Sequence, residues 1–133
     1  MPMIELFVVA VGGGIGAAAR FVIDGEIRSR HSGGFPWGTF VVNVVGSFLI
    51  GVFSTLLFPL VERGVPESTA HMVQLALTVG LCGGFTTFST ATVESVRLAR
   101  SGRLRLALAN TLGTLVVTVG AAGLGVALGG LLG

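Results

Sequence analysis

The chain has 133 residues, of which 52% are hydrophobic and 11% are charged, whereas a soluble domain carries about 25% charged residues. A membrane-spanning helix needs roughly 20 mostly apolar residues, so this length holds four spans with short loops and excludes a soluble catalytic domain. We therefore expect no enzyme activity. Eight arginines and no lysine produce the net charge of +2, which we interpret as loop topology and not as nucleic-acid binding.

Hydrophobicity predicts an all-α integral membrane protein with a single domain over residues 1–133. Its four spans are predicted at about 3–24, 38–60, 70–98 and 104–131. Polar loops at 25–37 and 61–69 and a short basic loop at 99–103 separate the spans. The one cysteine, Cys82, excludes an internal disulfide, and we interpret it as a small buried hydrophobic residue.

The first span ends with Arg20, and Gly12 and Gly16 occupy the same helix face. The pattern G-x-G-x-x-A that begins at Gly12 is also found in nucleotide-binding enzymes, but nothing soluble follows to complete a βαβ unit. A small multidrug transporter is another alternative with four spans. Such a transporter needs a carboxylate embedded in the first span, and Glu5 lies only near its end, so both alternatives are disfavoured.

The second and fourth spans carry polar side chains at helical spacing. Asn43 and Ser47 are four residues apart on the second span. Asn110, Thr114 and Thr118 form a stripe on the fourth. Because polar groups are costly in hydrocarbon, these faces are expected to contact protein or water. They indicate either interhelical hydrogen bonds or an ion path, and amide and hydroxyl donors without a ring of carboxylates favour a small hard anion.

The third span contains residues that disfavour a membrane helix. Gly83 and Gly84 are adjacent, and hydroxyl side chains follow at Thr86, Thr87, Ser89 and Thr90. We predict a helix break at this point, which is tolerated within a bilayer only where backbone is buried in protein or lines a wet cavity. An interrupted span is typical of an ion or substrate site near the bilayer midplane. Its freed carbonyls would suit a hard cation, and four short helices enclose little pore, which implies an oligomer.

The arginines are unevenly distributed among the loops. Only Arg63 belongs to the second loop. Seven lie in loops one and three or at the adjoining span ends: Arg20, Arg28, Arg30, Arg97, Arg100, Arg103 and Arg105. The positive-inside rule therefore predicts that loops one and three are cytoplasmic and that both termini are outside.

Three stretches together closely resemble the signatures of the Fluc (CrcB-type) fluoride channels. They are GGGIGAAAR at 12–20, GTFVVNVVGSF at 38–48 and GLCGGFTTFST at 80–90. The resemblance covers essentially the whole chain. It implies a multi-pass protein of the cytoplasmic (inner) membrane that exports fluoride passively. It also implies a dual-topology, antiparallel dimer in membrane lipid, with two pores and a structural sodium ion at the dimer centre.

The resemblance also implies roles for individual residues. The backbone carbonyls of Gly83 and Thr86 would hold the sodium ion. Arg20 would lie near the cytoplasmic vestibule, and Ser47 and Glu94 would be accessory residues. The fluoride path would include Asn43, Phe88, Ser89, Thr90, Asn110 and Thr114.

Two features depart from the family pattern. The family motif runs Phe-Ser-Thr-Phe, but this chain has Ala91 after Thr90. A homodimer whose subunits insert both ways also needs nearly balanced loop charges, and the arginine distribution is strongly biased. Our hypothesis is a heterodimer with a related chain of opposite topology, the alternatives being an antiparallel homodimer and a non-conducting scaffold subunit.

Overall fold

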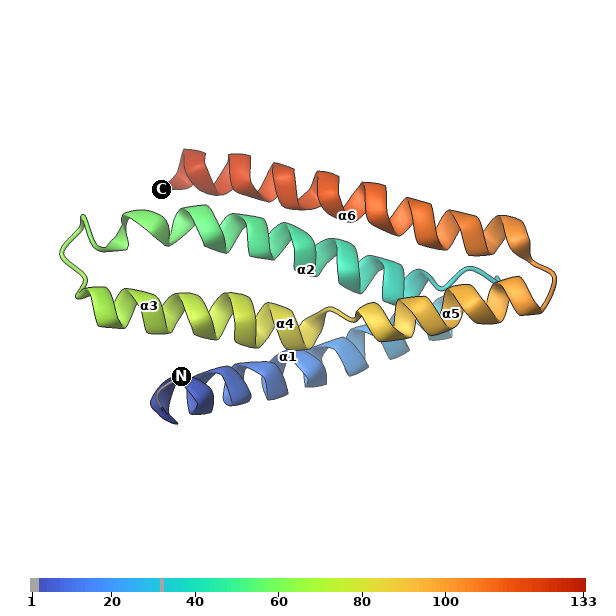
Figure 1. The fold of residues 1–133 in the computed structure, drawn as a ribbon, viewed down its shortest axis with the longest axis horizontal. Helices are drawn as coiled ribbons and strands as arrows, with labels where there is room; N and C mark the ends of the chain where they lie inside the picture. Colours follow the sequence, from blue (N-terminus) through green and yellow to red (C-terminus); the bar gives the residue numbers. More distant parts are fainter. Residues whose placement is uncertain (1–2, 32) are drawn as a thin grey trace.

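The computed structural model describes residues 3–31 and 33–133, so residues 1, 2 and 32 of the predicted domain lie outside the described residues. The described chain is helical, and its long helices run side by side in alternating directions (Figure 1). The elements are α1 (Met3–Arg30), α2 (Trp37–Leu56), η1 (Phe58–Leu60), α3 (Glu67–Leu75), η2 (Ala76–Cys82), α4 (Gly83–Phe85), α5 (Phe88–Arg100) and α6 (Leu104–Leu132).

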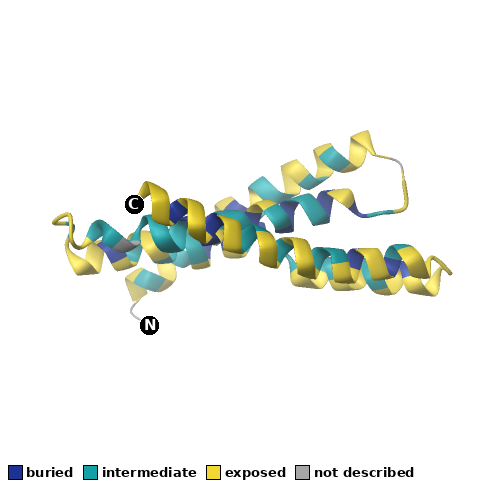
Figure 2. Ribbon diagram, turned by 90° about the horizontal axis from the view of Figure 1, so that it is seen from above, coloured by how far each residue is buried: buried dark blue, intermediate teal, exposed yellow. Residues whose placement is uncertain are grey.

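Within residues 3–31 and 33–133, four segments are long and apolar enough to cross a membrane, as predicted: Met3–Arg30, Trp37–Leu56, Glu67–Arg100 and Leu104–Leu132. The helix axes place loops one and three at one end of the bundle. Loop two and the two labelled termini lie at the other end (Figure 1). Many apolar side chains on the outer faces are exposed (Figure 2), as expected for surfaces that face lipid or another subunit.

The prediction of a loop at 25–37 was wrong for residues 25–30, which continue α1. Two ion pairs at i,i+4 spacing stabilise this extension, with 2.8 Å between Asp24 Oδ1 and Arg28 Nε and 2.7 Å between Glu26 Oε1 and Arg30 Nη2. The end of the second span also differs from the prediction. Helix α2 ends at Leu56, and a short 3₁₀ turn that contains Pro59 follows it.

Helix α1 packs closely against η2 and α4 through glycines. A Cβ atom at Gly16 would collide with the carbonyl of Leu81, and one at Gly84 would collide with the carbonyl of Gly13. Segment η2 is wound as a π-helix, a form that is frequent at functional sites. The glycines therefore bring the backbone of α1 against the irregular part of the third span.

Helices α2 and α6 pack in the same manner. A Cβ at Gly51 would meet the Ala122 carbonyl, and one at Gly125 would meet the Phe48 carbonyl. Small residues at such contacts let membrane helices approach closely where the hydrophobic effect between helices is absent. Helices α2 and α6 also contribute residues to the candidate site described below.

Candidate functional site

Two extended residues separate α4 from α5. Thr86 has φ −83° and ψ 159°, and Thr87 has φ −148° and ψ 118°. Thr87 is also the N-cap of α5, because its hydroxyl oxygen accepts a hydrogen bond from the backbone N–H of Thr90 at 3.2 Å. We call these two residues the junction.

Asn43 on α2 fixes the junction. Its Nδ2 donates to the carbonyl of Thr87 at 2.9 Å, and its Oδ1 accepts from the backbone N–H of Thr87 at 2.8 Å. The side chain is only 7% exposed. An asparagine side chain has two N–H donors and one carbonyl oxygen. Asn43 uses the oxygen and one N–H to bond the backbone of Thr87, and its second N–H remains for another partner.

The junction also diverts two N–H groups from the helix. In a continuous helix the N–H of Thr87 would bond the Gly83 carbonyl, and the N–H of Thr90 would bond the Thr86 carbonyl. Here Thr87 donates to Asn43 and Thr90 donates to the Thr87 side chain. The two carbonyls predicted to hold sodium are thus among those that lose a helical donor at the junction, and carbonyl oxygens are suitable ligands for a hard cation. Within the described residues, no group of three or more His, Cys, Asp or Glu side chains offers an alternative cation site.

A groove lies between α2, α5 and α6. It consists of two adjoining hollows, of about 460 Å³ and about 220 Å³. Ser47 lines the smaller hollow, and Asn110 lines the larger one. Four residues line both: Asn43, Phe88, Thr114 and Thr118. We call this feature the α6 groove, and it brings together five of the predicted path and accessory residues.

The polar side chains of the α6 groove are hydrogen-bonded to one another. Asn110, 1% exposed, donates to the Ala91 carbonyl at 3.2 Å and to Ser95 Oγ at 2.8 Å. Its Oδ1 accepts from the Thr114 hydroxyl at 3.4 Å, and the Thr118 hydroxyl donates to the Thr114 carbonyl at 2.6 Å. These bonds hold the donors in place along α6, and a threonine hydroxyl that rotates away from its own helix can donate to an anion in the groove.

Phe88 and Ala91 belong to the apolar part of the groove, which also includes Ile50, Val96 and Leu115. The Phe88 side chain is 85% exposed and borders both hollows. Ala91 borders only the larger hollow, where a longer side chain would take up part of the space. An aromatic ring carries positive partial charge at its edge, so Phe88 is able to present an electropositive edge to an anion.

Ser89 and Thr90 do not face the α6 groove. They line a separate hollow of about 220 Å³ with Arg28, Glu94 and Arg97. The structure of one chain therefore does not bring these two predicted path residues together with Asn110 and Thr114. Adjacent positions on a helix point in different directions, which is why one predicted motif divides between two faces of α5.

Arg20 and Glu94 lie at two further places. Arg20 Nε donates to the carbonyl of Gly84 at 3.3 Å, which ties α1 to α4. Glu94 Oε1 accepts hydrogen bonds from the Thr39 hydroxyl at 2.5 Å and from Arg28 Nη2 at 3.1 Å. Glu94 therefore belongs to a polar cluster at the loop-one end of the bundle.

Four residues of these networks were absent from the predicted site. They are Arg28, Thr39, Thr87 and Ser95. The sequence offered a partial signal for one of them, since Thr39 is four residues before Asn43 and shares its helix face. The contacts of Arg28 and Ser95 join helices that are distant in sequence, so local spacing contains no sign of them.

Comparison with known proteins places the chain in a family. The family model described as "CrcB-like protein, Camphor Resistance (CrcB)" matches residues 7–126. A protein of Leifsonia xyli subsp. xyli named "Fluoride-specific ion channel FluC 1" is 44% identical over 131 residues, covering 98% of this chain and 90% of that protein.

Two further relatives are named "Fluoride-specific ion channel FluC". The protein of Opitutus terrae is 41% identical over 117 residues, covering 88% of this chain and 86% of that protein. The protein of Agrobacterium fabrum is 44% identical over 128 residues, covering 96% of this chain and 97% of its own length. By the family match and by these relatives, the chain belongs to the CrcB-like family.

Proposed function

We propose that the chain is a subunit of a fluoride-specific channel that lets fluoride leave the cell passively through the cytoplasmic membrane. The observation that carries this proposal is the α6 groove, which is lined by amide and hydroxyl side chains together with the Phe88 ring. The groove has no carboxylate among its lining residues. The names of the relatives support fluoride as the transported ion.

A small hard anion suits these donors. N–H and O–H groups replace the hydration shell of an anion, and the electropositive edge of Phe88 adds a weaker attraction. Asn110 donates both of its N–H groups within the chain, and Thr114 donates its hydroxyl to Asn110. The groups that can turn to the ion are therefore the threonine hydroxyls and the remaining N–H of Asn43.

The proposed channel is an antiparallel dimer with two pores. The α6 groove and the hollow beside Ser89 and Thr90 lie on different faces of α5. A second subunit, inserted the other way, supplies the missing wall of each. In that arrangement the residues of the α6 groove line one pore, and the residues beside Ser89 and Thr90 line the second pore.

We further propose that the junction interrupts the third span within the membrane and holds a structural sodium ion. The Gly83 and Thr86 carbonyls would hold it, together with the matching pair of the other subunit. Both carbonyls have lost the helical donors that would otherwise bond them. A bound cation would stabilise irregular backbone where lipid offers no hydrogen-bond partner.

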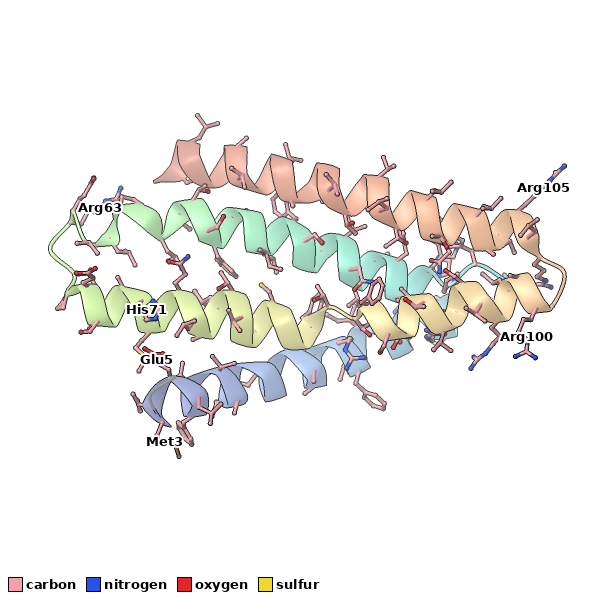
Figure 3. All side chains as sticks on the ribbon, in the orientation of Figure 1. Met3, Glu5, Arg63, His71, Arg100 and Arg105 are labelled. Atoms are coloured by element: carbon pink, nitrogen blue, oxygen red, sulfur yellow. The ribbon has the colours of Figure 1, made fainter. Side chains whose placement is uncertain are left out.

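The distribution of arginines supports a heterodimer. Arg100 and Arg105 lie at the loop-three end of the bundle, and Arg63 lies at the opposite end (Figure 3). Most of the positive charge is therefore at one end, which favours a single orientation. A related chain with the opposite bias would complete the antiparallel dimer.

Growth of a bacterium that lacks its own fluoride exporter tests the proposed function. We expect this chain, co-expressed with an opposite-topology homologue, to restore growth in fluoride-containing medium. A chain with Asn43→Ala serves as the matched control and should not restore it. Failure of the parent chain to protect cells in which it is present in the membrane would contradict the proposal.

Ala91 favours one alternative, a scaffold subunit that does not conduct. On that alternative, the chain completes the pore of its partner but forms no working pore itself. Changing the pore residues of this chain would then leave fluoride resistance unchanged, while changing those of the partner would abolish it.

A further inference from the structure

Three hollows at the loop-one end of the bundle meet at the Arg28–Glu94 pair. The outer hollow, of about 600 Å³, is also lined by Arg97, Ser101 and Arg103. The inner hollow, of about 220 Å³, is the one that contains Ser89 and Thr90. Arg28, Glu94 and Arg97 border both, and Arg28 and Glu94 also border a third, of about 200 Å³, under loop one. The Arg28–Glu94 pair therefore lies between the outer hollow, which is rich in arginine, and the inner hollow, which contains two of the predicted path residues. We call this position the wall.

Arg28 is held at this wall by three helices. Its Nε donates to Asp24 Oδ1 at 2.8 Å on α1, and its Nη2 donates to Thr39 Oγ1 at 3.0 Å on α2 and to Glu94 Oε1 at 3.1 Å on α5. The Arg28 side chain is 47% exposed, whereas that of Glu94 is 12% exposed. The guanidinium thus covers the carboxylate on the side that faces the hollows.

Three arginines, Arg28, Arg97 and Arg103, and one carboxylate, Glu94, line the outer hollow. A second carboxylate, Asp24, pairs with Arg28. Asp24 also approaches the backbone of Gly38 near the start of α2, where the helix dipole stabilises a carboxylate. Glu94 lies inside α5, and the arginine that forms an ion pair with it is Arg28, at 3.1 Å.

We propose that Arg28 is a positioning residue for anion passage, because it neutralises Glu94 where an anion moves between the outer and inner hollows. This inference rests on the proposed function. Without Arg28, the half-enclosed carboxylate of Glu94 repels any anion that approaches Ser89 and Thr90, and such repulsion is strong where water is scarce. Removing the carboxylate as well removes the repulsion.

Fluoride efflux from liposomes, read with a fluoride electrode, tests the inference on the complete assembled channel. The first variant is Arg28→Gln. We expect its efflux rate to fall about tenfold or more, because one unpaired charge near the path changes the barrier by that order. Arg28→Lys keeps the charge and should retain most of the rate. The matched control is Arg30→Gln, which removes the same charge from an exposed pair on the same helix turn and should leave the rate unchanged.

The double variant Arg28→Gln with Glu94→Gln separates charge from structure. We expect it to recover to within about threefold of the parent rate, since both charges are absent. If the double variant stays as slow as Arg28→Gln, the residue acts only by holding three helices together, and the inference is overturned. Parent-like efflux of Arg28→Gln would overturn it as well. Absence of fluoride efflux from the parent would instead refute the proposed function, and the inference with it.

Discussion

The amide of Asn43 makes two hydrogen bonds to one peptide unit, the N–H and the carbonyl of Thr87. A peptide group of a neighbouring strand would make the same pair of hydrogen bonds, but here the side-chain amide makes them. It satisfies backbone groups that a broken helix would leave unpaired, and such groups are costly when they are removed from water. The same residue borders the α6 groove, so the side chain that supports the backbone also lies on the proposed ion path.

Asn43→Ala should therefore damage both stability and transport. Two hydrogen bonds are lost and two backbone groups are left unpaired, which we expect to cost about 2–4 kcal/mol. Fluoride efflux should fall at least about tenfold. Thermal unfolding in detergent and liposome efflux measure the two effects. Ser54→Ala is the control on the same helix, because its hydroxyl bonds only the Gly51 carbonyl, and equal losses in both variants would contradict the assigned role.

Ala91→Phe tests whether the missing phenylalanine limits conduction. The larger hollow, of about 460 Å³, has room for a ring, and a second ring edge would add an electropositive contact for the anion. We expect the variant to increase fluoride efflux by about threefold or more when this chain lines the conducting pore. An unchanged rate, with normal assembly on size-exclusion chromatography, would indicate that the pore beside Ala91 carries no flux.

At the scale of elements, the third span is divided into parts with different roles. The π-helical η2 and the short α4 pack on the glycines of α1, whereas α5 presents polar residues to the hollows. Arg20 links α1 to the carbonyl of Gly84 beside the junction. The irregular backbone is thus covered by α1 and α2 on one side, while Gly83 is exposed on the other, where a bilayer would require protein or water to cover it.

Gly16→Ala should disturb this packing. Its Cβ would collide with the Leu81 carbonyl, a backbone atom that cannot move without shifting η2. We expect a loss of about 1–3 kcal/mol and a lower melting temperature in detergent. Gly14→Ala on the same helix has open space around its Cβ and should be neutral or stabilising by up to about 1 kcal/mol. Equal melting temperatures of the two variants would show that the close contact has no energetic weight.

The four spans and the family resemblance could be recognised from the sequence because both depend on the local order of residues. Runs of apolar residues and the pair Gly83–Gly84 are visible without any tertiary contact. The continuation of α1 to Arg30 was missed, since its residues are polar and their ion pairs form only once the helix exists. The separation of Ser89 and Thr90 from Asn110 was missed because the direction in which α5 presents each residue depends on its packing against α6.

At the scale of the whole molecule, several features of the single chain are those expected of one subunit of an oligomer. Many residues on its outer faces are exposed (Figure 2), large apolar ones among them, and its predicted path residues lie on two faces of α5, which the proposed second subunit would complete. The two released carbonyls at Gly83 and Thr86 supply only two oxygen ligands, and the matching pair of a second subunit would bring the proposed cation shell to four. Assembly and ion binding are therefore expected to be coupled.

Sodium should stabilise the assembled channel. A ligand that binds only the folded assembly adds about 2.7 kcal/mol at a concentration of 100 times its dissociation constant. We expect the melting temperature in detergent to rise with sodium chloride and to rise less with an impermeant organic cation at equal ionic strength. Identical curves in the two salts would argue against a structural sodium ion.

The most direct test of the account is fluoride efflux from liposomes that contain the purified chain, alone and together with an opposite-topology homologue. The account predicts rapid fluoride efflux that chloride does not share, with the heterodimer hypothesis predicting it only in the paired sample. Fluoride efflux from the chain alone would support the channel proposal but would contradict the heterodimer hypothesis in favour of a homodimer. Absence of fluoride efflux from both samples, with intact protein in the membrane, would contradict the central claim.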